Sequence, residues 1–122
     1  MNIRIKTTGY EMAPETQAYL NERLARIGKL LDRDATLARC EVEIGRDAGN
    51  QRHGANLWFA ELNIQIPGGR LIRATNRSES INAAIDDAKD EAERQIRRER
   101  KLHIRMWRKS GAAFKKLLRM SD

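Results

Sequence analysis

The chain has 122 residues, the size of one domain with a single modest core. It contains no run of about 18 apolar residues that would span a membrane, and its one cysteine, Cys40, excludes an intramolecular disulfide. The net charge is +7, which favours an acidic partner: nucleic acid first and an anionic membrane surface second. The opening residues lack the apolar run of a signal peptide, so a cytoplasmic location is expected.

The positive charge is concentrated in the last quarter of the chain. Residues 94–119 contain eleven Lys and Arg and one acid, Glu99, whereas residues 1–93 contain 13 bases and 15 acids. Interaction with a helix dipole, at about 0.3–1 kcal/mol per charge, explains one or two bases at a helix end but not this density. The pattern therefore indicates a surface for a polyanion, although a merely solvated charged face is the alternative.

The first part of the chain predicts a strand followed by a helix. Residues 2–7 alternate apolar and polar side chains, which predicts a short, half-buried strand. Pro14 suits the first turn of a helix, where a backbone N–H is not needed. An apolar stripe at helical spacing then runs from Leu20 to Leu31, and residues 32–36 are expected to form a loop.

Three further strands are predicted next. Residues 37–46 and 57–66 alternate, and the Gly- and Asn-containing stretch 47–56 between them predicts a hairpin loop. A Pro-Gly-Gly turn leads into a fourth strand at 70–75. Residues 76–80 offer polar side chains that can cap a following helix.

A long helix is predicted over residues 80–108. Apolar side chains recur at three- and four-residue steps from Ile81 to Ile96, and Lys and Arg recur at the same steps on the other side from Arg94 onward. Such a helix is about 43 Å long, whereas the predicted strands span roughly 20–33 Å. Its basic end must extend past the sheet. After Ser110 and Gly111, one or two short amphipathic turns are expected.

The order β-α-β-β-β-α predicts an α+β fold with one four-stranded sheet and both helices on one face. The first connection contains a helix and can join parallel strands, whereas the next two are hairpins. The other face carries polar side chains of the central strands and is expected to contact water. Residues 1–102 are predicted to form this domain and residues 103–122 a basic C-terminal extension.

Few side chains suit catalysis or metal binding. Cys40, His53 and His103 have no metal-ligand spacing, so no metal and no cofactor is expected. The acids of the long helix spread around its polar face and indicate no carboxylate site. We therefore expect no enzyme activity and no small-molecule substrate. Cys40 and Trp58 alternate with core positions and are expected to pack there.

Two features near the C-terminus have alternative interpretations. Trp107 lies within the basic run, where an aromatic ring can stack on a nucleobase or instead pack against the sheet or Phe114. Residues 112–120 mix Phe and Leu with Lys and Arg, which is typical of an interfacial helix. A peripheral-membrane or partner-docking role for this tail is therefore an alternative to a role in nucleic-acid binding.

Four stretches of the chain resemble one known family: MNIRIKTTGYEM, LNERLARIGKLLD, IPGGRLIRA and INAAIDDAKDEAERQIRRERKL. They cover about residues 1–102 and resemble the short form of the ribosome hibernation promoting factors, also called ribosome-associated inhibitors. The resemblance implies a fold similar to double-stranded-RNA-binding domains. It also implies a non-enzymatic stress factor that binds the small subunit of the 70S ribosome in the mRNA and tRNA channel, inhibits translation and promotes hibernation.

The resemblance further implies that basic residues of both helices contact 16S rRNA. The matching positions are Arg23, Arg26, Lys29, Arg94, Arg97, Arg98, Arg100 and Lys101, and the basic face of the helix adds Arg105 and Arg108. Glu91 departs from the Lys that many family members have in the middle of this helix. The second, dimer-forming domain of the long form is not expected, and neither is a dimer off the ribosome. A general module for double-stranded RNA or other nucleic acid is the alternative that charge alone does not exclude.

Overall fold

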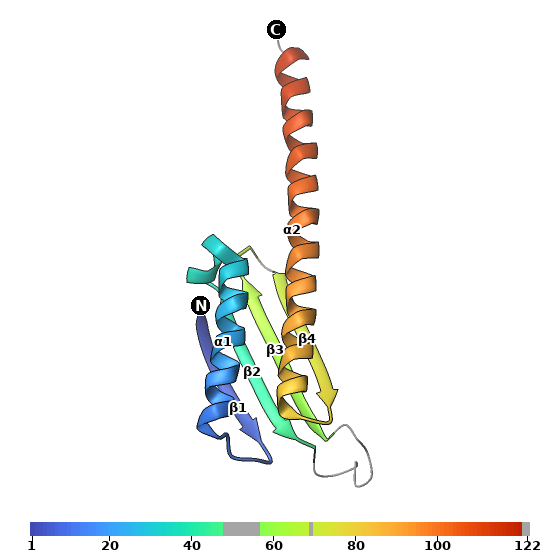
Figure 1. Cartoon of the computed structure of the whole chain (residues 1–122). Helices are drawn as coiled ribbons and strands as arrows, with labels where there is room; N and C mark the ends of the chain where they lie inside the picture. The colour runs from blue at the N-terminus through green and yellow to red at the C-terminus, as the bar shows by residue number, and fades with distance from the viewer. Residues whose placement is uncertain (48–56, 69, 121–122) are drawn as a thin grey trace.

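The structure is a computed structural model that describes residues 1–47, 57–68 and 70–120 (Figure 1). Within the last helix, the side chains of residues 103, 106, 107, 110 and 112–120 are outside the description. The elements are β1 (Asn2–Thr8), α1 (Pro14–Leu31), the 3-10 helix η1 (Asp32–Thr36), β2 (Arg39–Arg46), β3 (Trp58–Ile66), β4 (Arg70–Ser78) and α2 (Ile81–Met120). The predicted β-α-β-β-β-α order is confirmed.

The strands form one sheet in the order β1-β2-β3-β4. β1 is parallel to β2 because α1 lies between them in the chain, whereas β2, β3 and β4 are antiparallel neighbours. The register pairs Ile5 with Val42, Val42 with Leu62, and Leu62 with Ala74. Paired residues point to the same face, and both helices cover that face (Figure 1).

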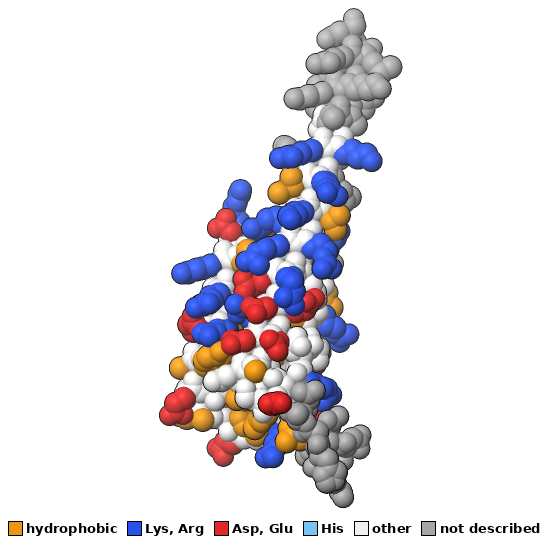
Figure 2. Space-filling view, turned by 45° about the vertical axis from the view of Figure 1, so that its right-hand side comes forward, with side chains coloured by type: hydrophobic (Ala, Val, Ile, Leu, Met, Phe, Trp, Pro, Cys, Tyr) orange, Lys and Arg blue, Asp and Glu red, His pale blue; other side chains and the backbone are white. Residues whose placement is uncertain are grey.

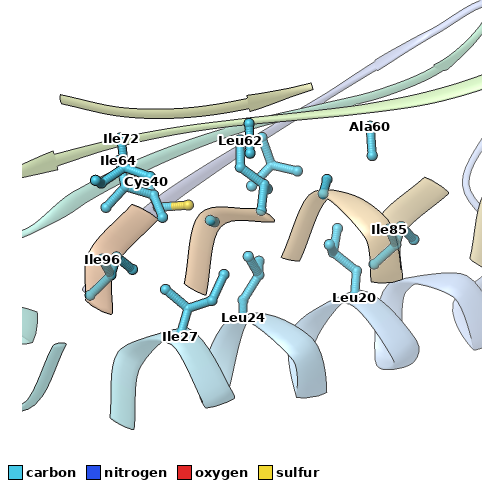
Figure 3. Packing of buried hydrophobic residues seen from close by; sticks show 14 of the residues in the cluster. Leu20, Leu24, Ile27, Cys40, Ala60, Leu62, Ile64, Ile72, Ile85 and Ile96 are labelled. Atoms are coloured by element: carbon cyan, nitrogen blue, oxygen red, sulfur yellow. The ribbon is translucent and has the colours of Figure 1, made fainter. Parts of the chain in front are cut away.

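The core lies between the helices and the sheet, and it uses the alternating positions that the sequence predicted. Figure 3 shows Leu20, Leu24 and Ile27 of α1 pointing toward α2 and the sheet. Ile85 and Ile96 of α2 lie in the same layer. Trp58 is half-buried at the edge of this core, as predicted, with its ring edge-to-face against Tyr10 at a centroid distance of 5.1 Å. This packing fixes α2 across the sheet and so sets the direction in which its end extends.

β1 is more exposed than predicted. Ile3 and Ile5 are 39% and 36% exposed, although they point to the helix-covered face beside Cys40 and Val42. The reason is that β1 is an edge strand, with a neighbouring strand on one side. The predicted half-buried strand is therefore an exposed edge.

The opposite edge of the sheet is held by α2. The side-chain amide of Gln95 donates a hydrogen bond to the backbone carbonyl of Arg73 at 2.8 Å. Its carbonyl oxygen accepts one from the Arg73 N–H at 3.3 Å. These bonds satisfy backbone groups on the free side of β4, which would otherwise be available to another strand. They also fix the middle of α2 beside β4.

Of three further predicted features, two were wrong and one is confirmed. β4 continues three residues further than expected, to Ser78, because its register with β3 is uninterrupted. Among the residues expected to cap α2, Ser80 does so: its Oγ accepts a hydrogen bond from the Ala83 N–H at 3.1 Å. Residues 32–36 form η1 rather than a loop, after a change of chain direction at Asp32, whose φ is 53°.

α2 is longer than the sequence predicted. It is one helix of 40 residues, about 60 Å at 1.5 Å per residue. The expected end at Arg108 and the separate turns after Ser110 and Gly111 were wrong, because the helix continues through them. Beyond Ile96, no described side chain of α2 is buried. Figure 1 shows the end of the helix extending well past the sheet.

Candidate nucleic-acid interface

Basic side chains are concentrated where α2 leaves the sheet. Figure 2 shows Lys and Arg side chains around this part of the molecule, next to a band of acidic side chains nearer the sheet. Residues three or four apart share one side of a helix, so part of the predicted set forms a stripe about 21 Å long. We call this set the α2 stripe. Its members, all exposed, are Arg94, Arg97, Arg98, Lys101, Arg105 and Arg108.

The two members of the α2 stripe nearest the sheet are paired with acids of the same helix. Arg94 contacts Glu91 at 2.7 Å, and Arg97 contacts Glu93 at 3.3 Å. Hydrogen bonds from the Gln95 amide and from Arg94 hold the pKa of the Glu91 carboxyl below its ordinary value. Exposed pairs of this kind contribute about 0–1 kcal/mol to stability. They nevertheless orient the two guanidinium groups and offset their charge.

The outer four members of the α2 stripe are not compensated in this way. Within residues 1–47, 57–68 and 70–120, no acidic side chain pairs with Arg98, Lys101, Arg105 or Arg108. The acid nearest in sequence, Glu99, contacts Arg70 of β4 at 3.7 Å instead. The uncompensated positive charge is therefore on the part of α2 that extends past the sheet.

Arg23 of α1 has a structural partner that the sequence did not reveal. Its Nε donates to Oδ1 of Asp86 on α2 at 3.0 Å, and its guanidinium lies 3.9 Å from the centre of the Tyr19 ring. The Tyr19 hydroxyl donates to Oδ2 of Asp86 at 2.5 Å. The Arg23 side chain is 23% exposed. The family resemblance implied that it contacts rRNA, whereas the structure joins it to the other helix.

The pKa values of this cluster follow from its contacts. Burial raises the pKa of Asp86, but the hydrogen bonds from Tyr19 and Arg23 lower it more, so the pKa of this carboxyl lies below its ordinary value. The pKa of the Tyr19 hydroxyl is raised, and the hydrogen bond from Tyr19 to Asp86 is the largest cause. Tyr19 and Arg23 are one turn apart on α1, which is a detectable spacing. The sequence contains no signal for the third member, because Asp86 is 63 residues from Arg23.

The remaining predicted residues lie on both helices. Arg26 is exposed and contacts Glu22 at 2.8 Å, and Lys29 is exposed on the same helix. Arg100 lies off the α2 stripe, and its guanidinium donates to the backbone carbonyl of Leu30 at the end of α1. Figure 2 shows basic side chains over both helices. The predicted residues therefore lie on the helical side of the molecule. They differ in how many hydrogen bonds and ion pairs each makes within the protein.

Some predicted features lie outside the described residues. The backbone of Trp107 is part of α2, but its side chain is not described, so stacking on a nucleobase stays a prediction. The side chains of residues 112–120 and the predicted hairpin loop with His53 are also outside the description.

Neither a metal-binding cluster nor a membrane-spanning helix occurs among the described residues. Over the described ranges, no group of three or more His, Cys, Asp or Glu side chains is placed to hold a metal ion. In those ranges no helix has the length and apolar character needed to cross a bilayer. Burial raises the pKa of the Cys40 thiol to about 12, so it is protonated at neutral pH.

The fold and the stripe together define a class of protein. It is a β-α-β-β-β-α domain whose last helix extends past the sheet and presents uncompensated cations along one side. Such a surface suits an elongated polyanion, because phosphates are bound by rows of Lys and Arg.

Comparison with known proteins identifies the family. The family described as sigma 54 modulation protein / S30EA ribosomal protein matches residues 3–103, and the chain belongs to it. The ribosome hibernation promotion factor of Deinococcus radiodurans is 32% identical over 88 residues, which cover 72% of this chain and 43% of that protein. The chain thus spans less than half the length of this curated relative. The resemblance predicted from the sequence is confirmed.

Solved structures show the same fold. The N-terminal domain of Protein Y from Thermus thermophilus has a TM-score of 0.63 and 27% identity, covering 80% of this chain and 98% of that one. A ribosomal subunit interface protein from Coxiella burnetii has a TM-score of 0.64, covering 83% and 99%. Its identity is 15%, so this second likeness concerns the fold alone.

Proposed function

We propose that the protein is a non-enzymatic stress factor that binds the small ribosomal subunit in the mRNA and tRNA channel, inhibits translation and promotes hibernation. The observation that carries the proposal is the uncompensated basic end of α2 in a chain of this family. The names of its relatives, a hibernation promotion factor and a subunit interface protein, support the same role. The protein would act in the cytoplasm and be a monomer off the ribosome.

The α2 stripe suits contact with rRNA phosphates. Arg can bond a phosphate with two parallel hydrogen bonds, and a helix keeps successive cations in fixed positions. Phosphate contacts fix position without reading sequence, so the shape of the channel would supply the preference for the ribosome. If six to eight phosphates are neutralised, the log–log slope of affinity against salt is roughly −5 to −7.

The proposed contacts differ in strength along the stripe. Arg98, Lys101, Arg105 and Arg108 would contribute most, because they have no described acidic partner. The other proposed contacts are Arg23, Arg26, Lys29, Arg94, Arg97 and Arg100, each of which except Lys29 also bonds within the protein. Residues 1–102 would form the ribosome-binding domain and residues 103–122 a basic extension.

The test is co-sedimentation with 30S subunits and 70S ribosomes across a salt series. One variant carries Arg98→Ala, Lys101→Ala and Arg105→Ala. Its matched control carries Arg4→Ala, Lys6→Ala and Arg39→Ala, which remove the same charge from exposed positions of β1 and β2. We expect saturable 30S binding and inhibition of in vitro translation for the wild type and the control, and a large loss of both for the first variant. The absence of 30S binding by the wild type at moderate salt would refute the proposal.

A general module for double-stranded RNA is the second candidate, because the stripe by itself attracts any polyanion. Competition separates the two functions. A ribosome factor stays on 30S subunits when an equal mass of bulk duplex RNA is added. A general module redistributes to the duplex.

A further inference from the structure

A cleft of about 270 Å³ lies where α2 leaves the body of the protein. Its walls come from four segments: the end of α1, η1, the end of β3 with the following turn, and α2. The apolar side chains that line it are Leu31, Ile66, Pro67, Ile96 and Ile104. The other lining side chains are Asp34, Glu99 and Arg100, so the cleft combines apolar walls with charged groups next to the most basic part of the surface.

The walls of the cleft are partly rigid and partly exposed. Leu31, Ile66 and Ile96 belong to the buried core and are at most 7% exposed. Ile104 is different, because it is 44% exposed and lies beyond the last buried residue of α2. A ligand in the cleft would cover this exposed apolar surface.

The rim of the cleft offers both kinds of hydrogen-bonding group. Arg100 is held there by its bond to the Leu30 carbonyl, and its guanidinium has further N–H groups to donate. The carboxylate of Asp34 in η1 is exposed and can accept. The segments that form the cleft also carry exposed cations, at Lys29 and Lys101 among others. Glu99 also lines the cleft, and its carboxylate contacts Arg70 at 3.7 Å. Apolar walls with donors, carboxylate acceptors and positive charge on the neighbouring segments match the chemistry of a single nucleotide.

We propose that this cleft holds one unpaired nucleobase of the RNA that the α2 stripe binds, an inference that rests on the proposed function. Unstacked bases are commonly recognised by covering their faces and bonding their edges. Here the aliphatic walls would cover the base, Arg100 and Asp34 would bond its edge, and the flanking cations would contact phosphates on either side. A volume just below the roughly 300–1,000 Å³ of small-molecule pockets suits one planar ring system.

A base fits these observations better than an apolar side chain of a protein. An apolar side chain would fill the walls, but it would leave Asp34 and the flanking cations without partners. Bases inside a duplex are stacked and cannot enter a cleft of this kind. The cleft would thus give a preference for unpaired RNA, which the charge of the stripe cannot supply.

The test compares two substitutions two residues apart on α2. Ile104→Ala removes a wall of the cleft, whereas Leu102→Ala removes a side chain of similar exposure, 41%, that lies on the side of α2 next to Leu71 and does not line the cleft. Each protein is added at saturation to 30S subunits. The Watson–Crick edges of unpaired 16S rRNA bases are then probed with dimethyl sulfate, kethoxal and a carbodiimide, and binding is measured by co-sedimentation. Urea unfolding checks that both variants fold.

The expected result is that the wild type and Leu102→Ala protect the same unpaired base. Ile104→Ala should lose this protection and bind roughly fivefold more weakly, because a partly exposed apolar contact is removed. Identical base protection by all three proteins would overturn the inference while leaving 30S binding, and hence the proposed function, intact. Weaker binding of Ile104→Ala with unchanged protection would also overturn it and indicate a protein side chain in the cleft. If the wild type does not bind 30S subunits, both the function and this site are refuted.

Discussion

Arg23 of α1 and Asp86 of α2 form an ion pair of 3.0 Å that joins the two helices. Arg23 is also one of the residues proposed to contact rRNA. Its loss would therefore affect the fold as well as RNA binding, and a change of affinity in an Arg23 variant cannot be assigned to a phosphate contact alone. The contribution of the pair to stability is best measured from the other side, at Asp86.

Asp86→Asn should lower the free energy of unfolding by about 1 kcal/mol at neutral pH, because the charged acceptor of Tyr19 and Arg23 is lost while the groups stay partly exposed. The folded pKa of Asp86 is below its ordinary value. Its contribution is thus fully present above about pH 4 and disappears as the pH falls through the folded pKa. Urea unfolding should show that the free energies of unfolding of Asp86→Asn and of the wild type differ less at pH 3 than at pH 7.

Asp87→Asn is the control for this prediction. Asp87 is exposed on the same helix, and among the described residues it has no ion pair. Its substitution should leave stability within about 0.5 kcal/mol of wild type at both pH values. A difference between Asp86→Asn and wild type that stays constant with pH would contradict the assignment.

Two glycines should respond to alanine in opposite directions. At Gly45 in β2, an added Cβ would lie 2.6 Å from the Phe59 ring and 2.7 Å from the backbone oxygen of Thr8, so β1 or the ring must move. We expect Gly45→Ala to cost about 1–3 kcal/mol. At Gly28 in α1, nothing lies within 4 Å of an added Cβ, and Gly28→Ala should stabilise by up to about 1 kcal/mol. Thermal and urea unfolding measure both. Equal effects of the two substitutions would show that packing at Gly45 does not decide the outcome.

Local patterns were sufficient to predict the elements and the core. The alternation around Val42 and Leu62 and the helical stripe from Leu20 to Leu31 each depend on neighbours in sequence, and the buried positions follow from them. The end of α2 could not be predicted in the same way. Ser110 and Gly111 together are a common break signal, but a long helix can continue through them at a cost of about 1 kcal/mol for the glycine.

The candidate site was predictable in composition but not in its electrostatic detail. The recurrence of Lys and Arg from Arg94 onward predicted a basic side of the helix. Which of these side chains is uncompensated depends on rotamers and on contacts with distant segments, as at Arg23 and at Arg100, whose partner Leu30 is 70 residues away. The cleft was missed for the same reason, because its four walls are separated in the sequence.

Cys40 should be inert in the folded protein. It is buried on β2, and burial is the largest cause of a thiol pKa of about 12. At pH 8 the thiolate fraction is then on the order of 10⁻⁴, and alkylation requires the thiolate. Native protein treated with iodoacetamide at pH 8 should remain unmodified by mass spectrometry, whereas protein in denaturant should gain one adduct. Rapid modification of the native protein would show that β2 opens readily from the sheet.

The acid at Glu91 should limit how strongly the protein binds RNA that is not its target. Glu91 holds Arg94 at 2.7 Å, so this arginine can neutralise a phosphate only by giving up its partner. Glu91→Gln leaves the side-chain shape nearly unchanged and releases the guanidinium. Each additional phosphate contact steepens the log–log salt slope by roughly 0.7–0.9, so binding of bulk duplex RNA should become tighter at low salt and more salt-dependent.

Asp87→Asn again provides the matched control, because it removes the same charge from α2 without releasing a described arginine. Fluorescence anisotropy with a labelled duplex, measured across a salt series, gives both slopes. If general electrostatics alone set the affinity, the two variants would bind equally well and with equal slopes. If the ion pair with Glu91 keeps Arg94 from contacting RNA phosphates, only Glu91→Gln gains a steeper log–log salt slope. The preference of the protein for 30S subunits over duplex RNA should fall in the same variant.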